Sequence, residues 1–362
     1  MTDDKDPADY LTRHVQTGGT GLQQKIDALV DASAGNSANA PLYREMILNI
    51  VRMAQADRDR WDAKIMLQTI AELEQAFARL EMFKRRRKVT VFGSARTHVD
   101  HQLYALARDM GRTLAQNDYM TITGAGNGIM GAAHEGAGLD NSLGFNITLP
   151  FEQRSNDIVY NTDHDLRFRF FFLRKLFFVK EADALVLCPG GFGTLDETLE
   201  VLTLIQTGKS PVVPIILLDV PDGGFWDGLL TFFKNQMCDQ GYILEADFNL
   251  ITLARSPDQA MQEILHFYSN YHSSRWVDRR YQLRMHKPLS DLTLDQINEQ
   301  FNDICEGGDF EQVGTGCPDP DEPELDGMHR LVFSFNGRHQ GRLRALINYV
   351  NRVENLRNPG SA

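Results

Sequence analysis

Short apolar runs alternate with amphipathic segments through the middle of the chain, from Val89 to about Asn270. The apolar runs are nearly continuous and rich in β-branched residues, which is typical of strands buried on both faces. This alternation predicts an α/β fold in which helices cover both faces of a doubly wound parallel sheet. We expect strands at 89–93, 119–123, 143–149, 183–188, 212–219 and 249–253, and helices near 101–116, 128–138, 173–182, 194–207, 225–238 and 257–270.

Apolar residues recur every three or four positions from Leu42 to about Lys84, so the pattern predicts one long helix or two helices in tandem. We assign a helical arm to 41–88. Residues 1–40 are predicted to be weakly ordered, apart from a short amphipathic helix at 22–32. The basic cluster 85–88 ends the arm, where cations are favoured by the helix dipole; binding of nucleic acid is the less favoured interpretation.

The composition changes again after the sheet domain, which we assign to 89–272. Residues 273–362 contain a polar helix (293–304), an acidic Pro-rich loop (317–326), a strand (329–336) and a helix (341–354). This pattern predicts a small C-terminal α+β appendage.

Composition restricts the class of protein. The chain has 37 basic and 49 acidic residues, a net charge of −12, which disfavours general binding to nucleic acid or to anionic membranes. No apolar run approaches the ~20 residues that span a bilayer, and the polar N-terminus does not resemble a signal peptide. The four cysteines lie far apart, so we expect neither a disulfide framework nor a zinc site. We therefore expect the protein to reside in the reducing cytoplasm.

Ligands of doubly wound sheets bind at the carboxyl ends of the strands, so the residues that follow each strand are candidates. Gly93-Ser94-Ala95-Arg96 follows the first strand and suits a phosphate or ribose. A glycine-rich loop with Gly124, Gly126, Gly128 and Gly131 follows the second. Read from Gly126 it matches G-x-G-x-x-G, but it does not follow the first strand, and no acidic residue ends the third strand. Both points weigh against a dinucleotide site.

The segment Pro189–Glu197 follows the fourth strand and combines three glycines with the start of a helix, which is a favourable arrangement for an anion. Thr194 and Glu197 also fit a capping box, a purely structural alternative. Upstream, a stripe of phenylalanines (Phe168, Phe170, Phe172, Phe177, Phe178) predicts core packing. Arg174 and Lys175 lie within this apolar segment, so they need a partner or access to water.

These motifs together resemble the LONELY GUY (LOG) family of Rossmann-like proteins, in particular its longer bacterial branch. The resemblance rests on PGGFGTLDE (189–197), Arg174-Lys175, GAGNGIMGAA (124–133), VFGSAR (91–96), LPFEQ (149–153) and LTLIQTGK (202–209), and covers about 89–270. Many family members carry the label possible lysine decarboxylase, although no lysine here has a recognisable pyridoxal-phosphate context. The stretch 154–165 is unfamiliar for the family, and we expect it over the base pocket.

The resemblance implies a nucleoside 5′-monophosphate phosphoribohydrolase that cleaves AMP or cytokinin riboside 5′-monophosphate to free base and ribose 5-phosphate. It implies that Glu197 and Arg174 are catalytic, with Lys175 in support. The implied phosphate and substrate ligands are Gly190, Gly191, Gly193, Thr194, Ser94, Arg96, Gly124, Gly126, Gly128 and Met130. No metal or other cofactor is implied.

Two alternatives remain open from the sequence. The chain could be a nucleotide-binding regulator without catalysis, or, less favoured, an NAD-type oxidoreductase. We also expect at least a homodimer, because the apolar stripe of the arm must be buried against its own domain or a second subunit. The expected partners are therefore a nucleoside monophosphate and a second copy of the chain, without nucleic acid or membrane.

Overall fold

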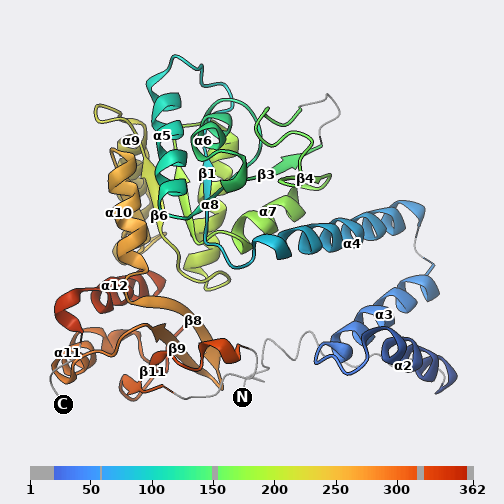
Figure 1. The fold of residues 1–362 in the computed structure, drawn as a ribbon. Helices are drawn as coiled ribbons and strands as arrows, with labels where there is room; N and C mark the ends of the chain where they lie inside the picture. The colour runs from blue at the N-terminus through green and yellow to red at the C-terminus, as the bar shows by residue number, and fades with distance from the viewer. Residues whose placement is uncertain (1–19, 58, 149–153, 316–321, 357–362) are drawn as a thin grey trace. The chain divides into compact units, whose positions relative to one another are not determined.

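The computed structural model describes residues 20–57, 59–148, 154–315 and 322–356, which divide into two compact units at Glu74–Gln75 (Figure 1). The first unit contains α2 (Thr20–Ala34), α3 (Ala40–Gln55) and most of α4 (Arg60–Leu80). Ile26, Val30 and Leu48 form a small core between α2 and α3. The periodic segment from Leu42 to about Lys84 contains two helices in tandem, α3 and α4, rather than one. Residues 1–19 lie outside the described residues.

The second unit is built on a seven-stranded parallel sheet in the order β4-β3-β2-β1-β5-β6-β7. Its strands are β1 (Lys88–Phe92), β2 (Met120–Thr123), β3 (Ser142–Ile147), β4 (Asp165–Phe168), β5 (Ala184–Leu187), β6 (Ile215–Leu218) and β7 (Ile251–Ala254). Its helices are α5 (Gln102–Gln116), α6 (Ile129–Ala137), α7 (Phe171–Lys180), α8 (Phe192–Gln206), α9 (Phe225–Phe232) and α10 (Pro257–Phe267). The predicted doubly wound fold is confirmed.

Helices cover both faces of this sheet. On one face, aliphatic side chains of β1, β5 and β6 form a fully buried core with α5, α6 and α10 (Figure 1). On the other face the core is aromatic: Phe178 lies 4.8 Å from Phe92 and Phe177 lies 5.4 Å from Phe168, measured between ring centroids. The expected aromatic core is correct for these residues, but Phe172 is exposed because α7 turns it away from the sheet.

The C-terminal part forms a four-stranded antiparallel sheet, β10-β11-β9-β8, with two helices. The elements are β8 (Tyr271–Val277), β9 (Arg280–Met285), α11 (Asp291–Phe301), β10 (Glu311–Val313), β11 (His329–Phe333) and α12 (Gln340–Val350). Helix α12 packs next to α10, as Figure 1 shows. Asn351 fixes this arrangement, because its side chain accepts from the amides of Asn270 and Tyr271 and donates to the Phe267 carbonyl.

The structure corrects three details of the sequence prediction. Strand β4 was not expected, because four residues at a sheet edge inside an aromatic stretch give little signal. The β8–β9 hairpin was also missed, since its two-residue turn has positive φ at Asp278 and Arg279 rather than at a glycine. The acidic loop predicted at 317–326 lies outside the described residues as far as residue 321.

The third correction concerns the basic cluster 85–88. These side chains do not cap the helix. Arg86 donates to the Asp140 carbonyl and to Asn141, Arg87 pairs with Asp183 at 3.1 Å, and Lys88 pairs with Glu181 at 3.2 Å. The cluster therefore lies where β1 begins, among carboxylates from other elements.

Candidate active site

The candidate site lies where the chain changes direction across the sheet. From β1 the sheet is built outward through β2, β3 and β4, and the chain then returns to place β5 on the other side of β1. The loops that follow β1 and β5 diverge at this point and leave a crevice at the carboxyl ends of the strands. The two loops touch at its floor, where the Ser94 amide donates to the Pro189 carbonyl over 3.3 Å.

A cavity of about 780 Å³ occupies this crevice. It collects the segments that follow β1, β2 and β5 together with the first turns of α7 and α8. Of the predicted site residues, those that line it are Ser94, Arg96, Gly124, Gly126, Met130, Arg174, Gly190, Gly191, Gly193, Thr194 and Glu197. The sequence signals on four separate segments therefore converge on one cavity.

Of the glycines after β5, Gly190 is required by close packing, whereas Gly191 and Gly193 leave the backbone open to the cavity. A Cβ atom at Gly190 would lie 2.2 Å from the Thr194 hydroxyl oxygen, whereas one at Gly191 or Gly193 would meet nothing within 4 Å. Helix α8 begins at Phe192 with Gly191 as its N-cap, so its free amides point to the crevice. Backbone amides at a helix N-terminus suit an anion such as phosphate.

The start of α8 also removes the capping-box alternative. Thr194 is the third residue inside the helix, and the N-cap, Gly191, receives no side-chain hydrogen bond. Glu197 therefore cannot return to an N-cap amide beside Thr194. Its position in the second turn places its carboxyl in the crevice instead.

Glu197 is a buried carboxyl in a charged neighbourhood. Burial raises its pKa, while Lys175 and Arg174 act in the opposite direction and Glu200 and Asp196 add to the increase. A carboxyl with a raised pKa beside a cavity has the properties of a general acid or base.

Arg174 supplies the positive charge of the cavity. Its guanidinium lies 5.1 Å from the ring centre of Phe171 and 5.5 Å from that of Phe178, and its Nε is buried without a hydrogen-bond partner. Among the described residues no carboxylate forms an ion pair with it, so its charge is available to an anionic ligand. Burial lowers its pKa, with Glu197 and Asp196 opposing.

Two predicted site residues lie outside the cavity lining. Lys175 is held by three carboxylates, at 2.9 Å from Asp196, 3.6 Å from Glu197 and 2.5 Å from Glu200. It supports Glu197 from behind and does not face the crevice. Gly128 has φ +64°, and a Cβ there would lie 2.3 Å from the Ser94 carbonyl oxygen. Its role in the structure is to let the β2 loop approach the β1 loop.

Parts of this chain are similar in sequence to known proteins. A family model described as possible lysine decarboxylase matches residues 128–264. A cytokinin riboside 5′-monophosphate phosphoribohydrolase from Arabidopsis thaliana is 38% identical over 89 residues, which are 25% of this chain and 40% of that protein. A probable enzyme of the same name from Oryza sativa is 28% identical over 187 residues, covering 49% of this chain and 76% of the relative.

The parallel-sheet domain of this chain is similar to phosphoribohydrolases of the LONELY GUY family. The match to the Arabidopsis relative and to a second relative from Oryza sativa spans only about two fifths of their length. Among solved structures, a molybdenum cofactor binding protein from Rippkaea orientalis is 22% identical with a TM-score of 0.36, over 49% of this chain and 94% of that one.

Sequence reasoning missed the residues that hold the glycine loop after β2. Asn156 donates from its side chain to the Gly126 carbonyl at 3.1 Å, and its amide donates to the Ala125 carbonyl at 2.7 Å. The Asn156 side chain also lies 3.1 Å from Nδ1 of His134, whose Nε2 is 3.1 Å from the Thr123 hydroxyl. Burial lowers the pKa of His134 to about 4, so this histidine is neutral near pH 7.

The stretch 154–165 therefore has a different role from the expected one. Its described residues do not line the cavity; Asn156 supports the glycine loop from behind, and Ser155 links Asn146 to Asp165. The preceding residues 149–153, part of the family resemblance, lie outside the described residues. No feature of a single sequence marks Asn156 or His134, because their partners are distant in the chain and are backbone atoms or buried side chains.

The described side chains place further limits on the chemistry. Within the described ranges, no lysine lines the cavity, and no group of three His, Cys, Asp or Glu side chains could hold a metal ion. In the same ranges we find no helix whose length and apolar character would let it cross a membrane.

Proposed function

We propose that this chain hydrolyses the N-glycosidic bond of a nucleoside 5′-monophosphate, AMP or cytokinin riboside 5′-monophosphate, to give free base and ribose 5-phosphate. The observation that carries the proposal is that the buried carboxyl of Glu197 lines the same cavity as the guanidinium of Arg174, which no described carboxylate pairs with, and as the glycine backbone after β5. The names of the plant relatives, phosphoribohydrolases of cytokinin riboside 5′-monophosphate, support it.

Glu197 is the proposed base. Cleavage of a ribosyl–nitrogen bond proceeds through an oxocarbenium-like transition state, in which positive charge develops on the ribose. An ionised carboxylate stabilises that charge and accepts a proton from the attacking water. Because Glu197 is held by Lys175 and its helix, its position does not depend on the substrate.

The amides that follow β5 are the proposed phosphate ligands. Gly190, Gly191, Gly193 and Thr194 would receive the 5′-phosphate at the start of α8, with Ser94 and Arg96 on the β1 side. Gly124, Gly126 and Met130 would form the opposite wall. Arg174 would neutralise the phosphate or assist departure of the base, since no described carboxylate forms an ion pair with it.

We propose that the chain acts as a homodimer whose contact adjoins this crevice. Phe171 and Phe192, which line the cavity, continue into an exposed apolar face on α7 and α8, and Phe192 is 93% exposed. Large apolar side chains at this density are typical of a protein–protein contact. The face consists of Phe171, Phe172, Leu176, Phe192 and Leu199. A second copy would cover it and exclude water from the crevice.

A chromatographic screen tests the proposed activity. The full chain is incubated with each common nucleoside 5′-monophosphate and with a cytokinin riboside 5′-monophosphate, and the released base and ribose 5-phosphate are measured. We expect stoichiometric release of both products from at least one substrate. Tight binding of a monophosphate without release of base would instead identify a nucleotide-binding protein that lacks hydrolysis.

A further inference from the structure

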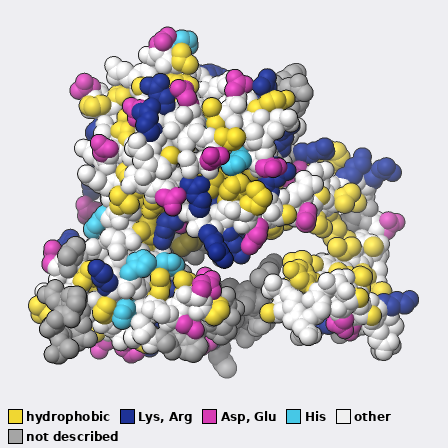
Figure 2. Space-filling model, in the orientation of Figure 1, with side chains coloured by type: hydrophobic (Ala, Val, Ile, Leu, Met, Phe, Trp, Pro, Cys, Tyr) yellow, Lys and Arg dark blue, Asp and Glu magenta, His cyan; other side chains and the backbone are white. Residues whose placement is uncertain are grey.

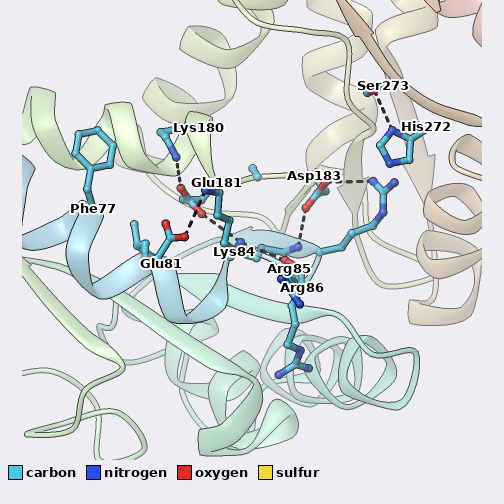
Figure 3. Close-up of a pocket in the computed structure, with 14 residues that line it drawn as sticks. Phe77, Glu81, Lys84, Arg85, Arg86, Lys180, Glu181, Asp183, His272 and Ser273 are labelled. Carbon is cyan, nitrogen blue, oxygen red and sulfur yellow. Dashed lines mark hydrogen bonds and ion pairs between the residues drawn. The ribbon is translucent and has the colours of Figure 1, made fainter. Parts of the chain in front are cut away.

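A second large cavity lies at the opposite edge of the parallel sheet, where β1 and β5 begin. We call it the amino-edge pocket; it has a volume of about 720 Å³. Its walls come from the end of α4, the basic cluster 85–88, the end of α7 with the residues before β5, and the start of β8 (Figure 3). The proposed hydrolysis does not use any of these residues.

The amino-edge pocket is positively charged although the chain carries a net charge of −12. Six Lys and Arg side chains line it against three Asp and Glu side chains. The cations are Lys84, Arg85, Arg86, Arg87, Lys88 and Lys180, and the acids are Glu81, Glu181 and Asp183. Dark blue side chains gather in a hollow on the face shown in Figure 2. A concave surface of one sign concentrates ions of the opposite sign.

The carboxylates around the pocket neutralise its cations only in part: Lys84 pairs with Glu81 at 3.4 Å, and Arg86 pairs at 3.3 Å with Asp118, which is not in the lining. Glu181 is shared between Lys88 at 3.2 Å and Lys180 at 2.6 Å, so one carboxylate serves two ammonium groups. Asp183 is occupied by Arg87 and by the Lys88 amide. Within the described residues, the Arg85 guanidinium has neither an ion pair nor a hydrogen bond. The positive surplus therefore remains for a ligand.

The C-terminal sheet closes the pocket without adding negative charge to its lining. His272 and Ser273 of β8 face it, and behind them the buried Arg284 donates to the Ser273 hydroxyl at 3.2 Å. The nearby carboxylate, Glu322, is engaged by Arg284 at 2.8 Å. Burial lowers the pKa of His272 to about 4, and the positive charges of Arg87 and Arg284 contribute to the decrease.

We propose that the amino-edge pocket binds a small polyphosphate anion, either a free oligophosphate or the phosphate chain of a nucleotide. The Arg85 guanidinium, which has no partner among the described residues, and the two ammonium groups that share Glu181 fit more than one phosphoryl group, and guanidinium groups suit phosphate oxygens. The concave shape favours a small ligand over a polymer. Phe77, which is 46% exposed at the rim, offers an aromatic face to a base (Figure 3).

This site is distinct from the candidate active site. Helix α7 connects the two, with Arg174 in the crevice and Lys180 in the amino-edge pocket. Six residues of helix separate them by about 9 Å along the axis, and β1 and β5 run between the same two ends of the sheet. One monophosphate bound in the crevice therefore cannot satisfy the cations of the amino-edge pocket.

Calorimetric titration of the full chain with tripolyphosphate and with ATP tests the proposal. The test variant is Arg85→Gln combined with Lys180→Gln, which removes two cations and leaves Glu181 paired with Lys88. We expect saturable binding by the full chain and a dissociation constant at least about tenfold higher in the variant, the effect of losing charge-assisted contacts. Binding should also weaken with added salt.

Two matched variants separate this site from other basic surfaces. Arg96→Gln removes a cation from the crevice, and Arg338→Gln removes an exposed cation elsewhere in the same unit. Both should bind tripolyphosphate within about twofold of the full chain. If the full chain does not bind, if the double variant binds as well as the full chain, or if Arg96→Gln alone abolishes binding, the proposal is wrong. If the double variant unfolds, Arg85→Gln alone, at an exposed side chain, decides the question.

Discussion

Replacement of Glu197 by glutamine separates the catalytic role of this side chain from its structural role. The substitution keeps the size of the side chain and removes its charge. A positioned acid–base group contributes about 10² to 10⁴ in rate, so we expect kcat for hydrolysis of AMP or its cytokinin analogue to fall by that factor. This corresponds to about 3 to 5 kcal/mol of transition-state stabilisation.

The stability of the Glu197→Gln variant should not fall with its activity. Lys175 keeps two carboxylates, Asp196 at 2.9 Å and Glu200 at 2.5 Å, so its ammonium group is not left unpaired. Burial raises the pKa of Glu197, and a carboxyl whose pKa is higher in the folded than in the unfolded state destabilises the fold as the pH rises above 4.5. We therefore expect an equal or higher Tm for the variant at pH 7.

Release of base, measured by chromatography, and thermal denaturation give the two readouts. Glu200→Gln is the matched control, because Glu200 contacts the same lysine from the same helix but does not line the cavity. It should retain activity within about fivefold. A Glu197→Gln variant that hydrolyses its substrate at the rate of the unmodified chain, or a Glu200→Gln variant that is equally inactive, would refute the assignment of the base.

Four further results are expected. Adenosine should be cleaved at least about a hundredfold less efficiently than AMP in kcat/KM, because it cannot make charge-assisted phosphate contacts; equal values would contradict the phosphate site. Activity should decrease as the pH falls through the raised pKa of Glu197, at a higher pH than for a glutamate of pKa 4.5, and a pH–rate profile would measure this. Gly190→Ala should lower the free energy of unfolding by about 1–3 kcal/mol through the contact with the Thr194 hydroxyl, whereas Gly191→Ala should change it by less than about 0.5 kcal/mol in denaturant titrations. In light scattering, Leu176→Glu should convert a dimer into monomers and Met46→Glu in α3 should not; the opposite result would place the contact on the arm.

The sequence by itself predicted the parallel sheet and the residues of the candidate site. Strands that are buried on both faces consist of consecutive apolar residues, so six of the seven were visible as runs such as VTVF or ALVL, whereas the short edge strand β4 was not. In a parallel sheet every strand ends at the same edge, so glycines and charged residues after the strands had to converge. Gly190, Arg174 and Glu197 could therefore be assigned to one site before any distance was known.

Features that depend on long-range contacts, namely the start of a helix, the direction of its neighbouring side chains and a second pocket, were visible only in the tertiary structure. The helix that carries Glu197 begins at Phe192 rather than at Thr194, with Gly190 packed close to the Ser94 amide of the β1 loop, and this start removed the capping alternative. Lys175 and Arg174 are neighbours in sequence, yet helical rotation directs one to three carboxylates and leaves the other unpaired in the crevice. The amino-edge pocket was likewise invisible, since the basic cluster 85–88, Lys180 and the β8 wall are distant in the chain and meet only in the folded unit.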